Sequence, residues 1–586
     1  MFSLLLTKSI FDIMNMVLVV IFLEVFMAFF LKKTRLNGRT YLSIVESFYS
    51  HDKKGTAHRT YKSLSSVETL LASGIEDPIA YCQKEVDQLN SEREKKSEKL
   101  ISEISPKRYL GYFPLKAVME KLSVQKYVNY FKLNTSFSFD LYEILSSLIY
   151  ARAVFPCSKQ KTFHDILPCL LEPASFTYSQ LLEGLAYIGN NYEKFAELFT
   201  MQMQKNYPVN TDTTYFDCTN FYFEIDREDD WRRRGPSKEG RNDPILGLGL
   251  MLDANQIPIG MKIYPGNESE KPVLRHVIQE LREQNHIQGR TIHVADKGLN
   301  CINNILFSLK NRDGYLFSKS IKGLSAIEQQ WVLREEGFRD VKDSSGNVLY
   351  RCKSVIDDFD YTVKDPAGKK QTVTLKEKRV VTYNPDLARK KVLEIRKLEE
   401  KAKGLCLSRA KKSEYGDCSK YVRFQGKTTG EDVQGVLNRE SIEKDLALAG
   451  YNMLVTSETK MSDADIYSTY HNLWRIEESF RIMKSDLDAR PVYVQKEETI
   501  KGHFLICYLT VLLERIWQFH VLNNQYSSES IYSFMKELQL VQSERGYVNI
   551  TSANDFIRSI HTLTGLPIMN YYLSETQLKK VLNYKL

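Results

Sequence analysis

Several patterns that mark common kinds of site are missing from this chain of 586 residues. Its nine cysteines include no C-x-x-C pair and its ten histidines include no H-x-x-x-H, so the usual spacings of a zinc site or a disulfide framework are excluded. Gly247 and Gly249 in "LGLGL" lack the third glycine of a dinucleotide-binding loop, and no Walker lysine follows them. We interpret these glycines as close packing within a strand, and the scattered cysteines as reduced, cytosolic usage.

A strong charge of either sign is also missing. The formal net charge is only +8, and the hydrophobic and charged shares of 43% and 26% are ordinary for a globular protein. A mild basic excess permits a nucleic-acid partner but does not demand one. The length allows about two to four domains with at least one large core.

The N-terminus holds one long apolar run, "MVLVVIFLEVFMAFFLKK", from Met16 to Lys33. As a membrane segment it would place Glu24 near the bilayer centre, at a cost of roughly 2.5–3.5 kcal/mol. As a signal peptide it lacks a small-x-small cleavage site and carries Asp12 early. A buried helix is a further reading. We favour translation from Met27, with residues 1–26 outside the fold and no membrane partner.

Patterning along the chain predicts a mixed α/β protein. After residue 211 the stretches "TTYFDCTNFYFEI", "PILGLGLMLD" and "IPIGMKIYP" predict three strands, "KPVLRHVIQELREQ" a helix and "RTIHVADKG" a further strand. This order suits a mixed sheet with helices packed on it. The expected divisions are 27–105 (strands and a charged helical linker), 106–207 (helical, with DNA binding as the sharper reading), 208–321 (sheet-forming), 322–444 (polar, basic and β-rich), 445–500 (a returning strand and helix) and 501–586 (helices).

Three acids stand where metal chemistry would need them. Asp217 lies inside a β-rich run, and Asp296 ends the strand "TIHVA" before a turn. Glu477 lies in "YHNLWRIEESFRIMKSDL", where a continuous helix would place it on an apolar stripe. Carboxylates held by rigid elements suit hard cations with open positions for phosphate. Each acid alone has an ordinary reading, as a turn residue, a helix cap or a salt-bridge partner.

Several stretches, in order, make the chain similar to a known family: "YFDCTNFYFE", "RRGPSKEGRNDP", "YPGNESE", "VADKGLN" and "YHNLWRIEESFRIMK". It resembles the DDE-type transposases of bacterial insertion sequences, in the subgroup with a Tyr-Arg-Glu-Lys signature. Tyr470, Glu477 and Lys484 fall at the signature's spacings, and Leu473 stands at its arginine position. Arg475 is a poor substitute because two residues turn a helix by about 200°; Arg481 is a better one. Members of the group tend to begin near the equivalent of Met27.

The resemblance implies a ribonuclease-H-like catalytic core in which Asp217, Asp296 and Glu477 are the catalytic acids and metal ligands. The implied cofactor is Mg2+, as two ions, with Mn2+ able to substitute. The gap between the second and third acids, 477 − 296 = 181 residues, implies a β-rich insertion at 322–444 that interrupts the core of 208–321 and 445–500. A helical N-terminal domain and a helical C-terminal tail would flank it.

The implied partner is double-stranded DNA, both the transposon ends and the target, with a dimer assembled on the DNA and a location in the bacterial cytoplasm at the nucleoid. The loop "WRRRGPSKEGR" would add contacts, although the acids of "EDD" before it also fit a solvated turn. An inactive DNA-binding relic and a metal-dependent nuclease on the same fold stay open. The residues expected to contact DNA are Tyr470, Lys484, Arg481, Arg234, Lys238 and Arg241.

Overall fold

The computed structural model describes residues 28–50, 55–97, 105–133, 135–172, 174–364, 368–406, 410–411, 415–425, 432–543 and 546–586. The chain divides into two compact units, Met1–Glu103 and Ile104–Leu586. The expectation that residues 1–26 are an extension outside the fold lies outside the described residues.

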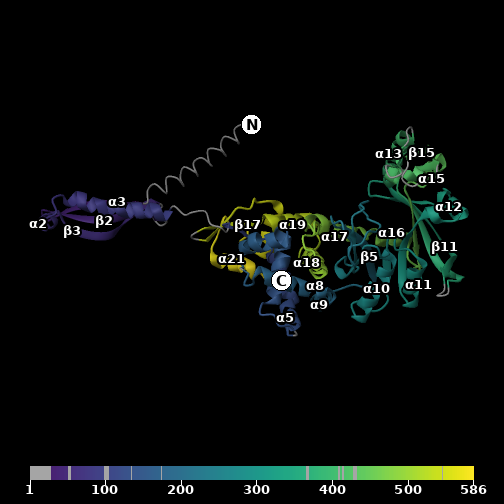
Figure 1. The fold of residues 1–586 in the computed structure, drawn as a ribbon, viewed down its shortest axis with the longest axis horizontal. Helices are drawn as coiled ribbons and strands as arrows, with labels where there is room; N and C mark the ends of the chain where they lie inside the picture. Colours follow the sequence, from purple (N-terminus) through teal and green to yellow (C-terminus); the bar gives the residue numbers. More distant parts are fainter. Residues whose placement is uncertain are drawn as a thin grey trace. The chain divides into compact units, whose positions relative to one another are not determined.

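The first unit is an antiparallel sheet of β1 (Phe29–Leu36), β2 (Arg39–Ser50) and β3 (Gly55–Ser66), followed by α2 (Val67–Ala72) and α3 (Pro78–Ser97) (Figure 1). Asn37 and Gly38 both have positive φ and form a two-residue turn that pairs Leu36 with Arg39, as an Asn-Gly hairpin requires. The helix expected as a linker instead packs on the sheet: the Asn90 side chain donates to the Phe29 carbonyl and accepts from its amide, both at 2.9 Å.

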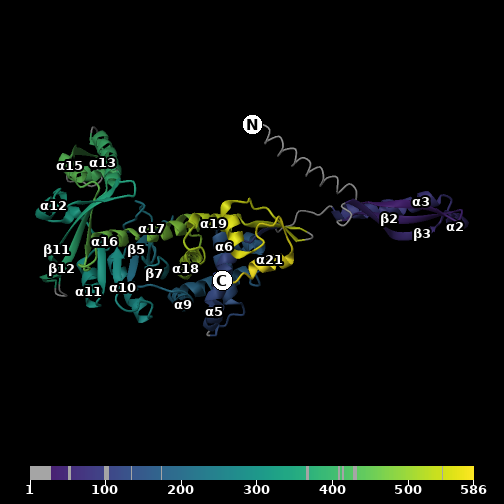
Figure 2. The ribbon, with the colours of Figure 1, turned by 180° about the vertical axis from the view of Figure 1, so that it is seen from behind.

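The second unit is built on a nine-stranded mixed sheet in the order β10-β11-β12-β16-β9-β8-β5-β6-β7 (Figures 1 and 2). β5, β6 and β7 form an antiparallel meander, and β8 and β9 then run parallel to β5. The predicted order of three strands, a helix and a strand is therefore present. The strands are β5 (Thr213–Tyr222), β6 (Ile245–Leu252), β7 (Pro258–Pro265), β8 (Ile292–Ala295), β9 (Gly314–Lys319), β10 (Arg339–Lys342), β11 (Val348–Lys364), β12 (Lys370–Tyr383) and β16 (Tyr451–Thr456).

The segment 322–444, expected as an insertion, contributes in two ways. Its strands β10, β11 and β12 extend the central sheet, because β12 pairs with β16. Most of the rest forms a small second core around buried Tyr415, Cys418 and Tyr421. The elements of this second core are α13 (Pro385–Cys406), β13 (Ala410–Lys411), β14 (Val422–Gln425), β15 (Asp432–Leu437) and α15 (Arg439–Ala447), whereas α12 (Ala326–Leu333) packs on the main core through Val332.

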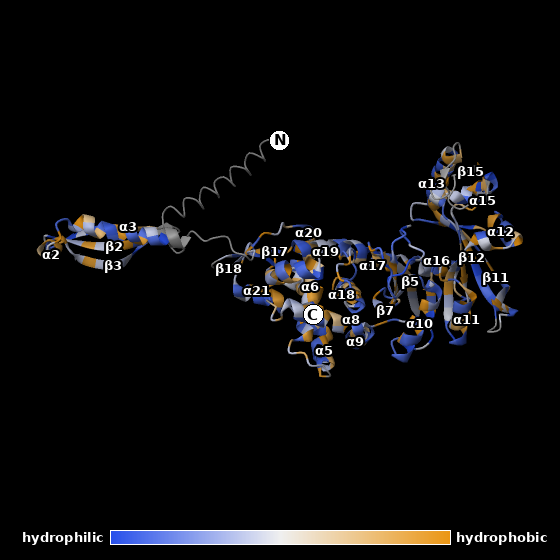
Figure 3. Ribbon diagram, in the orientation of Figure 1, coloured by the Kyte–Doolittle hydropathy of each residue, from blue (hydrophilic) through white to orange (hydrophobic). Residues whose placement is uncertain are grey.

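Helices and a small sheet make up the rest of the second unit. α6 and α18 are apolar along most of their length and are buried among their neighbours (Figure 3). Within the described residues α18, with the π-helical turn that follows it, is the one helix long and apolar enough to cross a membrane, but 83% of its most apolar window is buried inside the protein.

The α-helices are α4 (Phe113–Leu122), α5 (Val124–Lys132), α6 (Leu141–Val154), α7 (Lys159–Lys161), α8 (Tyr178–Asn190), α9 (Tyr192–Asn206), α10 (Glu270–Glu283), α11 (Ile302–Lys310), α16 (Asp463–His471), α17 (Trp474–Arg481), α18 (Glu497–Ile516), α19 (Ser528–Glu537), α20 (Asp555–Thr564) and α21 (Glu575–Leu582). The small sheet consists of β4 (Lys107–Tyr109), β17 (Gln539–Ser543), β18 (Gly546–Asn549) and β19 (Tyr572–Leu573).

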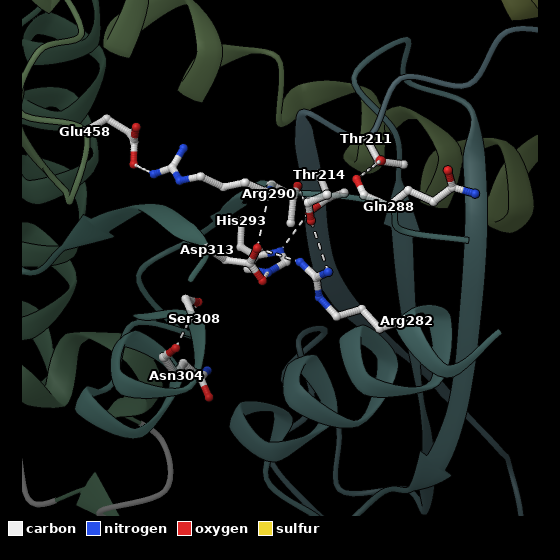
Figure 4. Close-up of polar contacts among 12 residues, drawn as sticks. Thr211, Thr214, Arg282, Gln288, Arg290, His293, Asn304, Ser308, Asp313 and Glu458 are labelled. Carbon is white, nitrogen blue, oxygen red and sulfur yellow. Dashed lines mark hydrogen bonds and ion pairs between the residues drawn. The ribbon is translucent and has the colours of Figure 1, made fainter. Parts of the chain in front are cut away.

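A buried polar cluster joins the starts of the three parallel strands (Figure 4). The Thr214 hydroxyl of β5 lies 2.8 Å from His293 Nδ1 of β8, and His293 Nε2 lies 3.2 Å from Asp313 Oδ2, just before β9. Arg282 of α10 donates to the same carboxylate at 2.5 Å. Buried polar groups are costly unless paired, so this cluster favours a single register of β5, β8 and β9. Farther along the same strands, Phe216 of β5 and Ala295 of β8 are thereby fixed beside each other.

Close packing of α8 against α18 gives a stability prediction. A Cβ on Gly189 would lie 1.7 Å from the Glu498 carbonyl oxygen, which belongs to backbone and cannot rotate away. We expect Gly189→Ala to lower the free energy of unfolding by about 2–3 kcal/mol or more, measured as the midpoint of urea unfolding. Gly404→Ala is the matched control, because a Cβ there meets nothing within 4 Å; it should be neutral or slightly stabilising. Equal midpoints for the two variants would contradict this account.

Candidate functional site

Two of the predicted acids lie side by side on adjacent parallel strands. Phe216 of β5 is paired with Ala295 of β8, so the next residues lie beside each other: Asp217 continues within β5, paired with Leu250 of β6, and Asp296 is the first residue after β8. Burial raises the pKa of Asp217 to about 6; the neighbouring carboxylates of Glu270 and Asp296 add to the rise, while the Lys238 ammonium opposes it. Carboxylates that raise one another's pKa are stabilised by a cation bound near them.

A lysine and a further acid complete this cluster. Lys238 Nζ lies 3.8 Å from Asp217 Oδ1 and 3.4 Å from Glu270 Oε1, and it donates to the Cys218 carbonyl. Glu270 is the first residue of α10, where the helix N-terminus favours a negative charge. The DNA contact predicted for Lys238 stays a prediction; in the structure its ammonium lies beside the Asp217 carboxylate.

Tyr470 connects the signature helices to the two strands. Its hydroxyl donates to Asp296 Oδ1 at 3.1 Å, across 174 residues of sequence. Burial, together with the Asp296 carboxylate, raises the pKa of Tyr470 above its ordinary value, so this hydroxyl keeps its proton and its donor role. α17 in turn packs against β5 and β6.

The expectation that Glu477 lies on a buried stripe is wrong. The segment is not one continuous α-helix: at Asn472 and Leu473 the backbone bonds run from residue i+3 instead of i+4, as with Arg475 N to Asn472 O, 3.1 Å. This tighter turn changes the rotation between α16 and α17. Glu477 is exposed, and among the residues that the structure describes its carboxylate has no hydrogen bond or ion pair.

The buried carboxylate of this helix belongs instead to Glu478. Its Oε2 accepts from Arg515 at 2.9 Å and from Arg475 at 3.0 Å; the side chains of Glu478 and Arg515 are 12% and 0% exposed. Although burial opposes it, the two arginines hold the pKa of Glu478 below its usual range. α17 is therefore anchored to α18 beside Glu477. Leu473, at the signature's arginine position, is buried in the core.

The other basic residues predicted to contact DNA have acidic or carbonyl partners. Lys484 lies 3.2 Å from Glu239, and Arg481 3.4 Å from Asp486. Arg234 donates to two backbone carbonyls within its own loop. Arg241 lies over the Tyr222 ring at 4.1 Å and contacts Glu224 and Asp243.

Comparison with known proteins decides the family. The model of the family described as "Transposase DDE domain" matches residues 217–513, just over half of the chain, and the match begins at Asp217. The chain belongs to the DDE transposase family. The family's activity is DNA cutting and joining, and its members generally use divalent metal ions.

Two further comparisons add little to this. The chain is similar to a solved structure titled as a cryo-EM structure of piggyBac transposase synaptic complex with hairpin DNA, at 10% identity and a TM-score of 0.35, covering 81% of this chain and 84% of that one. A likeness that weak carries no argument about this transposase. A search of curated proteins finds no match.

The side chains at this site of the transposase are of the chemical type that binds a divalent cation. Asp217, Asp296 and Glu270 supply hard carboxylate oxygens, and the raised pKa of Asp217 reflects a charge that a cation would stabilise. Across the described residues, no three His, Cys, Asp or Glu side chains lie close enough together to hold a metal ion. Asp217 and Asp296 are brought together, and Glu477 is not shown to join them.

Sequence reasoning missed two residues of this transposase. Glu270 was quoted in "YPGNESE" but given no role, although Ser269 before it caps a helix and could have indicated a helix start. Glu478 was passed over because its partner Arg515 lies 37 residues further along the chain.

The two neighbouring glutamates should respond differently to neutralisation. Glu478→Gln removes the carboxylate that accepts from Arg515 at 2.9 Å and leaves this buried guanidinium only Glu514, 3.9 Å away, so we expect a loss of about 3 kcal/mol in the free energy of unfolding. Glu477→Gln changes an exposed group without a described partner and should alter stability by less than about 0.5 kcal/mol. Urea unfolding of both variants tests this; a Glu478→Gln protein as stable as wild type would show that the buried pair does not anchor α17.

A buried acid next to that pair predicts a pH dependence. Burial raises the pKa of Glu514 to about 7, against 4.5 ordinarily, although the Arg515 guanidinium 3.9 Å away opposes the rise. Because the unfolded chain ionises first, this group favours folding below about pH 4.5 and loses that contribution as pH rises to about 7, about 3 kcal/mol in all.

The measurement is the free energy of unfolding of wild type and Glu514→Gln between pH 5 and 8. We expect the variant to gain on wild type as pH rises through this range. Glu497→Gln, an exposed acid of the same helix, serves as the control and should leave the pH dependence unchanged. Parallel curves for wild type and Glu514→Gln would refute the assignment.

Proposed function

We propose that this transposase belongs to a bacterial insertion sequence, in the subgroup with the Tyr-Arg-Glu-Lys signature, and moves that element by cutting DNA at its ends and joining the freed 3′ ends to target DNA. The observation that carries the proposal is the placement of Asp217 and Asp296 side by side on parallel strands with Tyr470 bonded to Asp296. We further propose that β5 to β9 with their helices form a ribonuclease-H-like core, interrupted by residues 322–444.

Three acids would act together in this proposal. Asp217 would hold its carboxylate from within β5 and Asp296 from the end of β8, and Glu477 would supply the third from α17. Two Mg2+ ions, or Mn2+ in their place, would supply activation of the attacking oxygen and stabilisation of the leaving 3′-oxygen. Tyr470 orients Asp296 through its hydrogen bond, and Lys238 keeps the charges of Asp217 and Glu270 balanced in the unbound protein.

The proposed partner is double-stranded DNA, at the element's ends and at the target, and the proposed location is the bacterial cytoplasm at the nucleoid. Both ends must be held together for joining, which supports a dimer assembled on DNA. Phosphate contacts from Lys484, Arg481, Arg234 and Arg241 remain part of the proposal and would require these side chains to exchange an acidic or backbone partner for phosphate.

A cleavage and joining assay tests the proposal. Purified full chain is mixed with Mg2+ or Mn2+ and a DNA fragment that carries the element's flanking repeats. Glu477→Gln and Asp217→Asn should still bind but lose cutting and joining by about a thousandfold, since several kcal/mol of transition-state stabilisation would be removed. Glu268→Gln, an exposed acid without a described ion pair, is the matched control and should act as wild type.

Each contrary result has a definite meaning. Acid variants that cut as well as wild type would remove these residues from the chemistry. A wild type that binds without cutting would be an inactive relic, and one that cuts without joining would be a nuclease. Restoring the signature with Leu473→Arg is a poor test, because Leu473 is only 6% exposed and an arginine there would have to be buried.

A further inference from the structure

Charge is separated within the first unit. The described strand region, residues 28–50 and 55–66, carries six Lys and Arg against one acid, Glu46. The helical region, residues 67–93, carries two Lys and Arg against six acids. The positive pole is therefore the sheet, and the negative pole is the pair of helices behind it.

Among the described residues, a helix covers one face of this sheet. Glu46 of β2 accepts from Arg93 of α3 at 3.4 Å, and Lys62 of β3 donates to Glu85 of α3 at 2.5 Å. Leu42 and Ile44 share the Glu46 face by strand alternation and are buried. Figure 1 shows α3 lying along the sheet.

The opposite face presents aromatic, hydroxyl and basic side chains around one buried residue, Val45. By register it carries Phe30, Lys32 and Thr34 from β1 and Arg39 and Tyr41 from β2. Phe30 and Tyr41 are 37% and 41% exposed, although large aromatic side chains are usually buried. Lys32 and Arg39 are exposed beside them.

Four cations of the β1–β2 hairpin have no acid within ion-pair distance among the described residues. We call Lys32, Lys33, Arg35 and Arg39 the hairpin cations; by register Lys32 and Arg39 lie on the free face, and Lys33 and Arg35 lie on the face that carries Leu42. This distinguishes them from Lys238, Lys484 and Arg241 around the acids, each of which contacts a carboxylate. The tight Asn37–Gly38 turn fixes the two strands that carry them.

We propose that the hairpin cations and the free face of this sheet bind double-stranded DNA, with the β1–β2 ribbon in the major groove. The groove, about 12 Å wide, admits a two-stranded ribbon. The hairpin cations contact phosphates on both sides, and Thr34 and Tyr41 meet base edges. The choice of DNA as the polyanion rests on the proposed function.

The experiment measures DNA binding by the full chain as a function of salt. The hairpin variant replaces all four hairpin cations with alanine. Each phosphate contact contributes about 0.9 to the slope of log affinity against log salt, so we expect the slope to fall by about 3 to 4 and affinity to fall at least tenfold. A control variant removes the same charge elsewhere, from exposed lysines, and should keep the wild-type slope: Lys84→Ala, Lys390→Ala, Lys397→Ala and Lys401→Ala.

A charge-retaining variant separates loss of charge from loss of structure: Lys32→Arg, Lys33→Arg, Arg35→Lys and Arg39→Lys. It should keep the wild-type slope while the alanine variant loses it. An unchanged slope in the alanine variant overturns the inference, as does binding of the hairpin cations to phosphatidylserine vesicles in place of DNA.

The outcome is independent of the cutting assay. A wild type that cuts DNA, with a hairpin variant of unchanged slope, refutes this inference and leaves the proposed function standing. A wild type that does not cut, with a hairpin variant that loses slope, supports the inference and refutes the proposed function.

Discussion

The parallel pairing of β5 with β8 is the constraint on which the candidate site depends. It places Asp217 beside Asp296, although 79 residues separate them in sequence (296 − 217 = 79) and their like charges oppose the arrangement. Hydrogen bonds near the start of the same strands oppose that repulsion. There the Thr214 hydroxyl bonds to His293 Nδ1, and the Asp313 carboxylate accepts from His293 Nε2. A buried polar cluster favours one register over a slipped one, since a slip would leave its members unpaired. The strands that carry the acids are therefore held in register by hydrogen bonds of other residues, and Asp296 is oriented in addition by its own hydrogen bond from Tyr470.

The helix that carries Glu477 is held in a similar indirect way. Its neighbour Glu478 is bound by Arg515, so one residue anchors α17 and the next is left facing outward with its charge unpaired by any described residue. Adjacent residues on a helix lie about 100° apart, so an inward Glu478 requires Glu477 to point away. The tyrosine of the signature adds a second tie, from α16 to Asp296. Two residues in the signature segment therefore hold its helices in place: Tyr470, which belongs to the signature, and Glu478, which does not.

How much of this could be read from the sequence depends on the range of the interactions. The strands around Asp217 and Asp296 were predictable, because alternation and apolar runs are local patterns. The face of Glu477 was not, since a continuous helix was assumed and the i+3 bonds at Asn472 change its phase. Glu478 and Glu270 owe their roles to partners far along the chain, which periodicity cannot reveal. Likeness of motif led to the family, which the family model then showed, but geometry was needed to show that Lys238 faces the first acid.

The net charge of the chain and the distribution of charge in the structure lead to different expectations about a partner. A net charge of +8 over 586 residues says little about a partner. Around the acids, loop cations such as Lys238 and Arg241 are neutralised by carboxylates close to them, so their number overstates the positive potential there. In the first unit the described strands sum to 6 − 1 = +5 and the helical region to 2 − 6 = −4, which is almost neutral in total and strongly polar in space. A polyanion responds to local potential rather than to the total, so a nearly neutral unit with separated poles can bind it more strongly than a more basic surface whose charges are already paired.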